Sequence, residues 1–276
     1  MKEKIAIVCG GGGMKCAYSA GALFGLATVH NLKEPAILVG SSGSTGSLAY
    51  YAAGQYSSIK AIWADLISSK KLISFKRLNR IVDIDYLIDS IIKVQEPLNE
   101  EKVNQSKTKL FISATEYATG KTKYFQNLKE NNLFESLRAS KAIPFLFNRK
   151  VNIKDIEYVD GSIAAPTSTN VRKAISEGAE NIVVISDMSK VSLSNKVFWK
   201  IYALFVSRDL RKAIKRYLKE RFSVDDFKDT NIFSISPSKE LATHSLDNKK
   251  ENLEKMFNLG FEDAKNSQEL KAFLDS

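Results

Sequence analysis

The chain has 276 residues, 44% of them hydrophobic and 26% charged, with a formal net charge of +10 at pH 7. This length can bury a full core, so we expect one globular domain over residues 1–276. No apolar stretch reaches about 18 residues, which argues against a transmembrane helix. The apolar run after the charged start is too short for a signal peptide. The two cysteines form no disulfide framework and fit a cytoplasmic protein. The positive charge favours acidic partners, and anionic lipid and nucleic acid both qualify.

The first predicted strand, residues 4–9, runs directly into four glycines, Gly10 to Gly13, which precede a predicted helix over residues 14–30. Glycines at this point expose backbone N–H groups, and the helix dipole adds positive potential. Such a loop binds a phosphate or stabilises a developing oxyanion. A P-loop would need Gly-Lys-Ser/Thr, but Lys15 is followed by Cys16. A dinucleotide fingerprint fits poorly because Cys16 occupies the position of its third glycine.

The second predicted strand, residues 36–39, ends in a cluster of Gly and Ser before a small-residue helix over residues 47–53. Strand, sharp turn and helix with a Ser at the turn is the arrangement of a nucleophile elbow. Gly40 is the first small residue of the G-x-S-x-G pattern, Ser42 is the predicted nucleophile, and Ser44 stands where the second glycine is expected. Ser44 is itself a rival nucleophile, because Ser44-Thr45-Gly46 resembles an elbow shifted by two residues. A glycine loop followed by an elbow is best explained jointly, as an oxyanion hole and a nucleophile.

The rest of the chain alternates between predicted strands and helices, which indicates a mainly parallel sheet covered on both faces. Residues 54–99 have a sequence pattern typical of helices and are interpreted as an inserted or capping region. The strand at 156–159 delivers Asp160 at its end. The further predicted strands are residues 109–115, 121–126, 181–186 and 231–236, and the further helices are residues 133–142, 171–177 and 249–259.

One long helix is predicted over residues 195–222, rich in basic residues and aromatic in its first part. A helix that combines these side chains is typical of one that lies on an anionic membrane. A half-buried helix with a basic outer face is the alternative.

Four segments together resemble the patatin-like phospholipases in residues, order and spacing. They are the glycine loop at 10–18, the elbow at 40–44, the segment Arg138-Ala139-Ser140-Lys141-Ala142-Ile143-Pro144, and Asp160-Gly161-Ser162. Cys16 and Ser44 stand where that family has glycine. The likeness covers about residues 4–190, which leaves residues 191–276 as a C-terminal helical extension. It implies a three-layer α/β/α fold related to the α/β hydrolases.

The resemblance also implies a serine lipid acyl hydrolase that cleaves carboxylic esters of phospholipids or related lipids, with no metal or cofactor. By this likeness Ser42 attacks the ester carbonyl and Asp160 is its general base. The residues implied to support them are the oxyanion-hole glycines Gly11, Gly12 and Gly13, the turn glycines Gly40, Gly43 and Gly161, and Lys15, which braces the loop or meets a head-group phosphate.

Two alternatives stay open. One is a degenerate, non-catalytic protein that binds an anion or lipid through the glycine loop, and the off-pattern residues Cys16 and Ser44 favour it. The other is an esterase with a Ser42-Asp160-His244 triad, whose members occur in the right order along the chain. The expected partner is a lipid or ester substrate, with peripheral contact to an anionic membrane, and nucleic acid is not expected.

Overall fold

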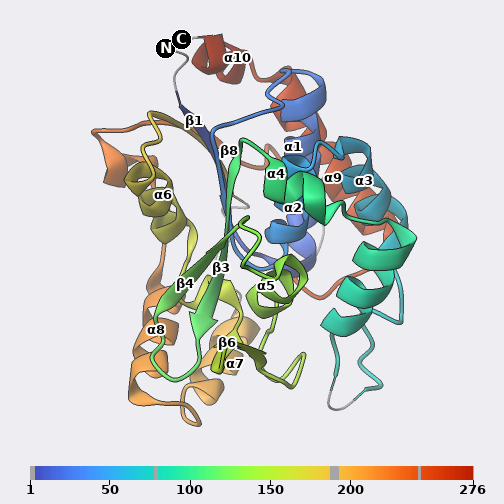
Figure 1. Ribbon diagram of the computed structural model, residues 1–276, viewed down its shortest axis with the longest axis vertical. Coiled ribbons are helices and arrows are strands. Elements are labelled where there is room, and N and C mark those ends of the chain that lie inside the picture. Colours follow the sequence, from blue (N-terminus) through green and yellow to red (C-terminus); the bar gives the residue numbers. More distant parts are fainter. Residues whose placement is uncertain (1–3, 78–79, 187–192, 242–243, 276) are drawn as a thin grey trace.

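The structure is a computed structural model that describes residues 4–77, 80–186, 193–241 and 244–275 (Figure 1). In these residues eight strands form one sheet in the order β5-β6-β3-β2-β1-β7-β8, and β4 pairs with β3 outside this path. The strands are β1 (Ile5–Cys9), β2 (Ile37–Gly40), β3 (Lys109–Glu116), β4 (Thr122–Gln126), β5 (Val151–Ile153), β6 (Ile156–Val159), β7 (Asn181–Ile185) and β8 (Asn231–Ile235). The α-helices are α1 (Cys16–Thr28), α2 (Ser44–Ala52), α3 (Tyr56–Ala61), α4 (Glu100–Gln105), α5 (Leu133–Ser140), α6 (Thr167–Ser176), α7 (Leu193–Tyr202), α8 (Arg208–Lys219), α9 (Lys250–Asn266) and α10 (Gln268–Asp275).

The centre of the sheet is parallel, because β3, β2, β1, β7 and β8 pair with one another in parallel. Side chains of β1 alternate between two apolar clusters: Ile7 faces the cluster formed with α1, α2 and α9, and Val8 faces the one formed with α6. Figure 1 shows these helices on opposite sides of the sheet. Strands buried on both faces read as continuous apolar runs, which is why the sequence indicated them. The predicted three-layer α/β fold is confirmed.

Strand β6 brings the chain to the end of β2. Thr115 of β3 pairs with Thr122 of β4 on one edge and with Val159 of β6 on the other. Strand β6 therefore lies on the same edge of β3 as β2, beyond the point where β2 ends. Since β6 runs antiparallel to β3, the residue after Val159 arrives at the carboxyl end of β2.

The C-terminal part of the chain is tied closely to the first elements. Strand β8 pairs in parallel with β7 at the sheet edge, and α9 packs along α1. The two helices cross at backbone distance, because a Cβ placed on Gly21 would lie 1.8 Å from the Phe257 carbonyl oxygen and one on Gly260 would lie 2.0 Å from that of Tyr18. Only glycine permits this approach.

Some expectations about local structure are wrong. The single helix over residues 195–222 is two helices, α7 and α8, because the Ser207 hydroxyl accepts a hydrogen bond from the Leu210 N–H and starts a new helix. The capping region contains two π-helical segments, Ile62–Leu66 and Tyr86–Gln95, besides α3. The sequence pattern did not reveal β5 or α4, and it started α2 three residues late. No helix of the described residues is long and apolar enough to cross a bilayer.

Candidate active site

Ser42 occupies a strained turn between β2 and α2. Its φ angle is 54°, in the left-handed region that residues with a side chain rarely adopt. Close packing around it explains the small neighbours: a Cβ on Gly40 would lie 2.4 Å from Leu48 Cδ1, and one on Gly43 would lie 2.7 Å from the Gly13 carbonyl oxygen. This strand, turn and helix have the geometry of a nucleophile elbow.

Asp160 is held against Ser42 by a set of directed hydrogen bonds. Ser42 Oγ donates to Asp160 Oδ2 at 2.6 Å, and the Ser162 N–H donates to Asp160 Oδ1 at 2.9 Å. The Asp160 N–H donates to the Ala142 carbonyl at 3.0 Å, and Thr115 Oγ1 donates to the Asp160 carbonyl at 2.8 Å. Both Ser42 and Asp160 are buried. The carboxylate is therefore fixed in one orientation, with one oxygen directed at the Ser42 hydroxyl.

Burial raises the pKa of Asp160 above the usual range of an aspartic acid. The hydrogen bonds from Ser42 and Ser162 and the nearby Lys141 ammonium act in the opposite direction but do not outweigh the desolvation. A raised pKa makes this carboxylate a stronger base than an exposed one.

The other serines of the elbow are engaged with the protein interior. Ser44 Oγ donates to the Ser41 carbonyl at 2.9 Å, and the residue is fully buried. Ser41 Oγ donates to the Ala165 carbonyl at 2.7 Å and accepts from Asn170 Nδ2 at 2.7 Å. Of the three serines, Ser42 is the one that lines the neighbouring cavity.

The glycine loop reaches the elbow as expected from the sequence. A Cβ on Gly11 would lie 3.0 Å from Ser42 Cβ and 2.1 Å from Ser162 Oγ, so the backbone of Gly11 lies directly against the pair. Gly13 has a φ of 61°, which turns the loop into α1. No residue in the described parts of the chain accepts a hydrogen bond from the N–H groups of Gly11, Gly12 or Gly13. These donors are available to a bound group beside Ser42.

Gly161 and Lys15 are the two remaining residues predicted to support the site. Gly161 is required by close packing, because a Cβ there would lie 2.2 Å from the Ser113 carbonyl oxygen. Lys15 is half-buried in the turn before α1. Its suggested contact with a head-group phosphate stays a prediction.

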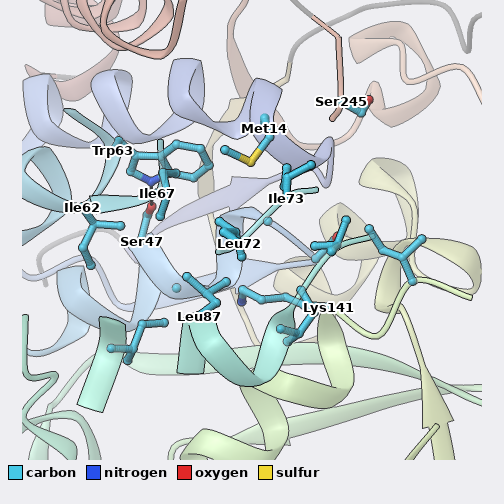
Figure 2. A pocket seen from close by; sticks show the side chains of 18 of the residues that line it. Met14, Ser47, Ile62, Trp63, Ile67, Leu72, Ile73, Leu87, Lys141 and Ser245 are labelled. Atoms are coloured by element: carbon cyan, nitrogen blue, oxygen red, sulfur yellow. Dashed lines mark hydrogen bonds between the residues drawn. The ribbon is translucent and has the colours of Figure 1, made fainter. Parts of the chain in front are cut away.

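An apolar cavity of about 80 Å³ opens beside Ser42 (Figure 2). Nearly half of its lining residues come from the capping region, and Figure 2 shows Ile62, Trp63, Ile67, Leu72, Ile73 and Leu87 directed into it together with Met14. The two π-helical segments contribute Ile62, Trp63, Leu87 and Ile92. The sequence indicated a capping region but not that it encloses a cavity at the elbow.

The segment Ser140–Lys141–Ala142 connects the two partners. Ser140 Oγ accepts a hydrogen bond from the Ser42 N–H at 3.0 Å, and the Ala142 carbonyl accepts from Asp160. Lys141 between them lines the cavity. This segment carries part of the family resemblance in the sequence, which gave it no role in the site. The contacts of Ser140 and Ala142 join residues far apart in the sequence, so the sequence pattern does not reveal them.

Neither histidine contacts the Ser42–Asp160 pair among the described residues. His244 is exposed, and His30 Nε2 forms a hydrogen bond with the Ala264 carbonyl at 2.8 Å. Groups of acidic, histidine or cysteine side chains able to hold a metal are likewise absent from the described part of the chain.

A family model described as patatin-like phospholipase matches residues 7–171, more than half of the chain. The chain therefore belongs to the patatin-like phospholipase family, and the resemblance seen in the sequence is confirmed. A second model, described as a domain of unknown function (DUF6363), matches residues 222–275.

The chain is 26% identical over 190 residues to the uncharacterized protein YjjU of Escherichia coli (strain K12), a match that covers 66% of this chain and 51% of the relative. It thus spans about half the length of the curated relative it matches. Among solved structures it is similar to VipD from Legionella pneumophila, with a TM-score of 0.59, 12% identity, and coverage of 99% of this chain and 67% of that chain. It is also similar to human GIVD cytosolic phospholipase A2, solved with a methyl gamma-linolenyl fluorophosphonate inhibitor and terbium chloride, at a TM-score of 0.47, 10% identity, and coverage of 99% and 59%.

Proposed function

We propose that the protein is a serine lipid acyl hydrolase that cleaves carboxylic ester bonds of phospholipids or related lipids through a Ser42–Asp160 dyad. The observation that carries this proposal is the 2.6 Å hydrogen bond from Ser42 Oγ to Asp160 Oδ2 at the wall of an apolar cavity. Membership of the patatin-like phospholipase family supports the class of reaction. The cavity suits an acyl chain because its lining is almost wholly aliphatic and aromatic.

In the proposed reaction Ser42 Oγ attacks the ester carbonyl while its proton passes to Asp160 Oδ2. The carbonyl oxygen becomes an oxyanion within reach of the N–H groups of Gly11, Gly12 and Gly13, and such donors typically contribute about 3 kcal/mol each. The tetrahedral intermediate collapses, the alcohol leaves with the proton from Asp160, and an acyl-Ser42 remains. Water then attacks this ester, again losing its proton to Asp160, and releases the free acid and Ser42.

The two alternatives are less well supported by the geometry. Cys16 and Ser44 do not push the elbow and the loop apart: Cys16 is buried with its Sγ 3.8 Å from the Gly10 carbonyl oxygen, and Ser44 turns its hydroxyl into the interior. A degenerate binding protein is therefore not required by these substitutions. A triad with His244 would need that exposed side chain to replace an existing contact of Ser42.

Fluorophosphonate labelling followed by peptide mapping tests the proposal. The reagent forms a covalent bond with an activated serine, so labelling is expected at Ser42, absent in Ser42→Ala, and retained in the matched variant Ser44→Ala. Hydrolysis of a p-nitrophenyl ester should follow the same pattern. Labelling at Ser44, or ester hydrolysis that survives Ser42→Ala, would refute the assignment.

We further propose that α7 and α8 bring the site to an anionic membrane. The side chains of Leu204 and Phe205 are 67% and 72% exposed, and large apolar groups so exposed to water are typical of an interaction surface. Next to them α8 carries the exposed basic residues Arg208, Lys212, Lys215, Arg216 and Lys219. Trp199 and Tyr202, two of the aromatic residues of the first part, are buried against α8 and contribute to the core, as the half-buried alternative expects. Phe145, two residues after the cavity-lining Ile143, packs its ring 5.0 Å from that of Tyr202.

Vesicle flotation separates the apolar and the electrostatic contributions to this contact. Each basic residue near an anionic surface contributes about 1 kcal/mol, and salt screens it. Binding to vesicles rich in phosphatidylglycerol should weaken as salt is raised, and Phe205→Ser should weaken it at every salt concentration. Val94→Ser, which alters a side chain exposed to 68% on another element, is the matched control. Salt-independent binding, or equal loss with Val94→Ser, contradicts the proposal.

Residues 191–276 belong, in this proposal, to the same domain as the catalytic core. The pairing of β8 with β7 and the packing of α9 on α1 support this, since neither element has another partner of that extent among the described residues. Cys9 and Cys16 are buried and are not joined in a disulfide, which is compatible with the proposed cytoplasmic location.

A further inference from the structure

Lys141 is a charged side chain in the apolar cavity that the proposed reaction does not use. It is 4% exposed, and Figure 2 shows its side chain directed into the cavity toward Leu87. A Cβ on Gly46 would lie 4.0 Å from Lys141 Nζ and 3.9 Å from Ile92 Cδ1, so the ammonium group is beside an aliphatic wall. This is an unusual place for a lysine, because lysine is rarely buried without a charged partner.

The ammonium group has fewer acceptors than it can use. Lys141 Nζ donates to Thr45 Oγ1, whose own hydroxyl donates to the Ser42 carbonyl at 2.8 Å. No carboxylate of the described residues lies within ion-pair distance of Lys141. A lysine ammonium has three N–H donors, so further donors remain for a group inside the cavity. A buried cation without a counter-ion is costly, and an anion in the cavity would remove that cost.

The charge on Lys141 is finely balanced. Burial lowers the pKa of Lys141 to about 7, while the electrostatic effect of two nearby titratable groups, the Asp160 carboxyl and the Cys16 thiol, acts to raise it. Tyr50 on the same wall stays neutral, because burial raises the pKa of its phenol well above the usual range. Both charge states of Lys141 are therefore populated near neutral pH, and an anion bound beside it would favour the protonated one.

We propose that the cavity is a binding site for a free long-chain carboxylate, with the alkyl chain among the apolar side chains and the carboxylate paired with Lys141. The inference rests on the proposed function in one respect: the acid released by hydrolysis is such a ligand, so the site would retain its product and be inhibited by it. An aliphatic wall beside Lys141 suits a monoanion that carries a hydrocarbon chain, whereas a phosphate head group would leave its other oxygens without donors there. Without Lys141, the Asp160 carboxylate would repel the ligand.

Calorimetric titration of the intact protein with dodecanoate tests this without any turnover. Dodecan-1-ol, which has the same chain and no charge, is the matched ligand, and Lys141→Met removes the ammonium at similar length. At pH 6 we expect Lys141→Met to weaken dodecanoate binding at least tenfold and to change dodecan-1-ol binding less than about twofold. Between pH 6 and pH 8 the wild-type affinity for dodecanoate should fall about tenfold further than that of Lys141→Met, since the protonated fraction of a group with a pKa of about 7 falls by that factor.

Lys141→Gln, with thermal unfolding of both variants, guards against an effect of misfolding. Equal affinity of wild type and folded variants for dodecanoate, an equal loss of dodecan-1-ol binding, or no binding of dodecanoate by wild type overturns this proposal. The experiments distinguish failure of this binding site from failure of the proposed hydrolase function. Dodecanoate binding that depends on Lys141 in a protein without ester hydrolysis would support the site and refute the hydrolase, and hydrolysis with Lys141-independent binding would do the reverse.

Discussion

Replacing Asp160 by Asn separates the chemistry of the site from its architecture. In the wild type one carboxylate oxygen accepts from the Ser162 N–H at 2.9 Å and the other accepts from Ser42 Oγ at 2.6 Å. An Asn side chain can keep the first bond with its carbonyl oxygen and then presents its NH₂ group to Ser42. The side chain would occupy the same space, but Ser42 would face a donor that cannot accept its proton.

The expected loss follows from that change of role. Removing a general base typically costs about 10²- to 10⁴-fold in rate, and more where the two groups act as a unit. This corresponds to about 3 to 5 kcal/mol of transition-state stabilisation. The free energy of unfolding should not fall with the activity. The pKa of Asp160 is raised in the folded state, so its ionisation near pH 7 opposes folding. The stability that the protonated carboxyl contributes is lost as pH rises through this raised pKa. Asn removes this penalty, so Asp160→Asn should unfold at a Tm no lower than that of the wild type.

The assay is hydrolysis of a p-nitrophenyl ester by purified Asp160→Asn, His244→Ala and His30→Ala, with thermal unfolding of each. We expect Asp160→Asn to lose activity while folded and both histidine variants to stay near the wild type. Near-normal hydrolysis by Asp160→Asn, or its collapse in His244→Ala, would show that the dyad is wrong.

Four further outcomes are expected. Cys16→Leu should destabilise the fold by ~1–3 kcal/mol through overpacking against the elbow, and an unchanged Tm would show that the gap is roomy. Gly260→Ala should cost at least about 2 kcal/mol, because its Cβ would meet the Tyr18 carbonyl oxygen of α1; wild-type stability would contradict the close crossing. If Asp160 is the base, as proposed, it accepts a proton only when ionised, so kcat/KM should fall as pH is lowered through its raised pKa. Lys141→Met, which removes a nearby cation, should move this acid limb to higher pH, and a pH–rate profile checks the direction.

The elements that the sequence indicated best are those with a strong local cause. The buried parallel strands are unbroken apolar runs, and β6 (Ile156–Val159) was predicted with the bounds it has in the structure. The helix over residues 195–222 was predicted wrongly because residues 203–207 contain no Gly or Pro to mark the break, and the cap at Ser207 is a single side chain that the periodicity does not reveal. Composition left open whether the aromatic residues of this stretch face a membrane or the core, and Trp199 and Tyr202 are buried.

The sequence by itself determined the loop and the elbow as local motifs, because a glycine run and a tight turn impose their backbone geometry on neighbouring residues. It could suggest Ser42 and Asp160 as partners only through a family resemblance. Ser42 and Asp160 are 118 positions apart in the sequence. Their contact depends on the position of β6, which lies beyond the end of β2 on the same edge of β3. The choice between Ser42 and Ser44 depends on which of the two residues lines the cavity. The cavity with Lys141 exists only because separate helical segments enclose it. Local steric rules act between neighbours in the sequence, whereas a pocket is made by packing between distant segments, so only the tertiary structure decides its shape and charge.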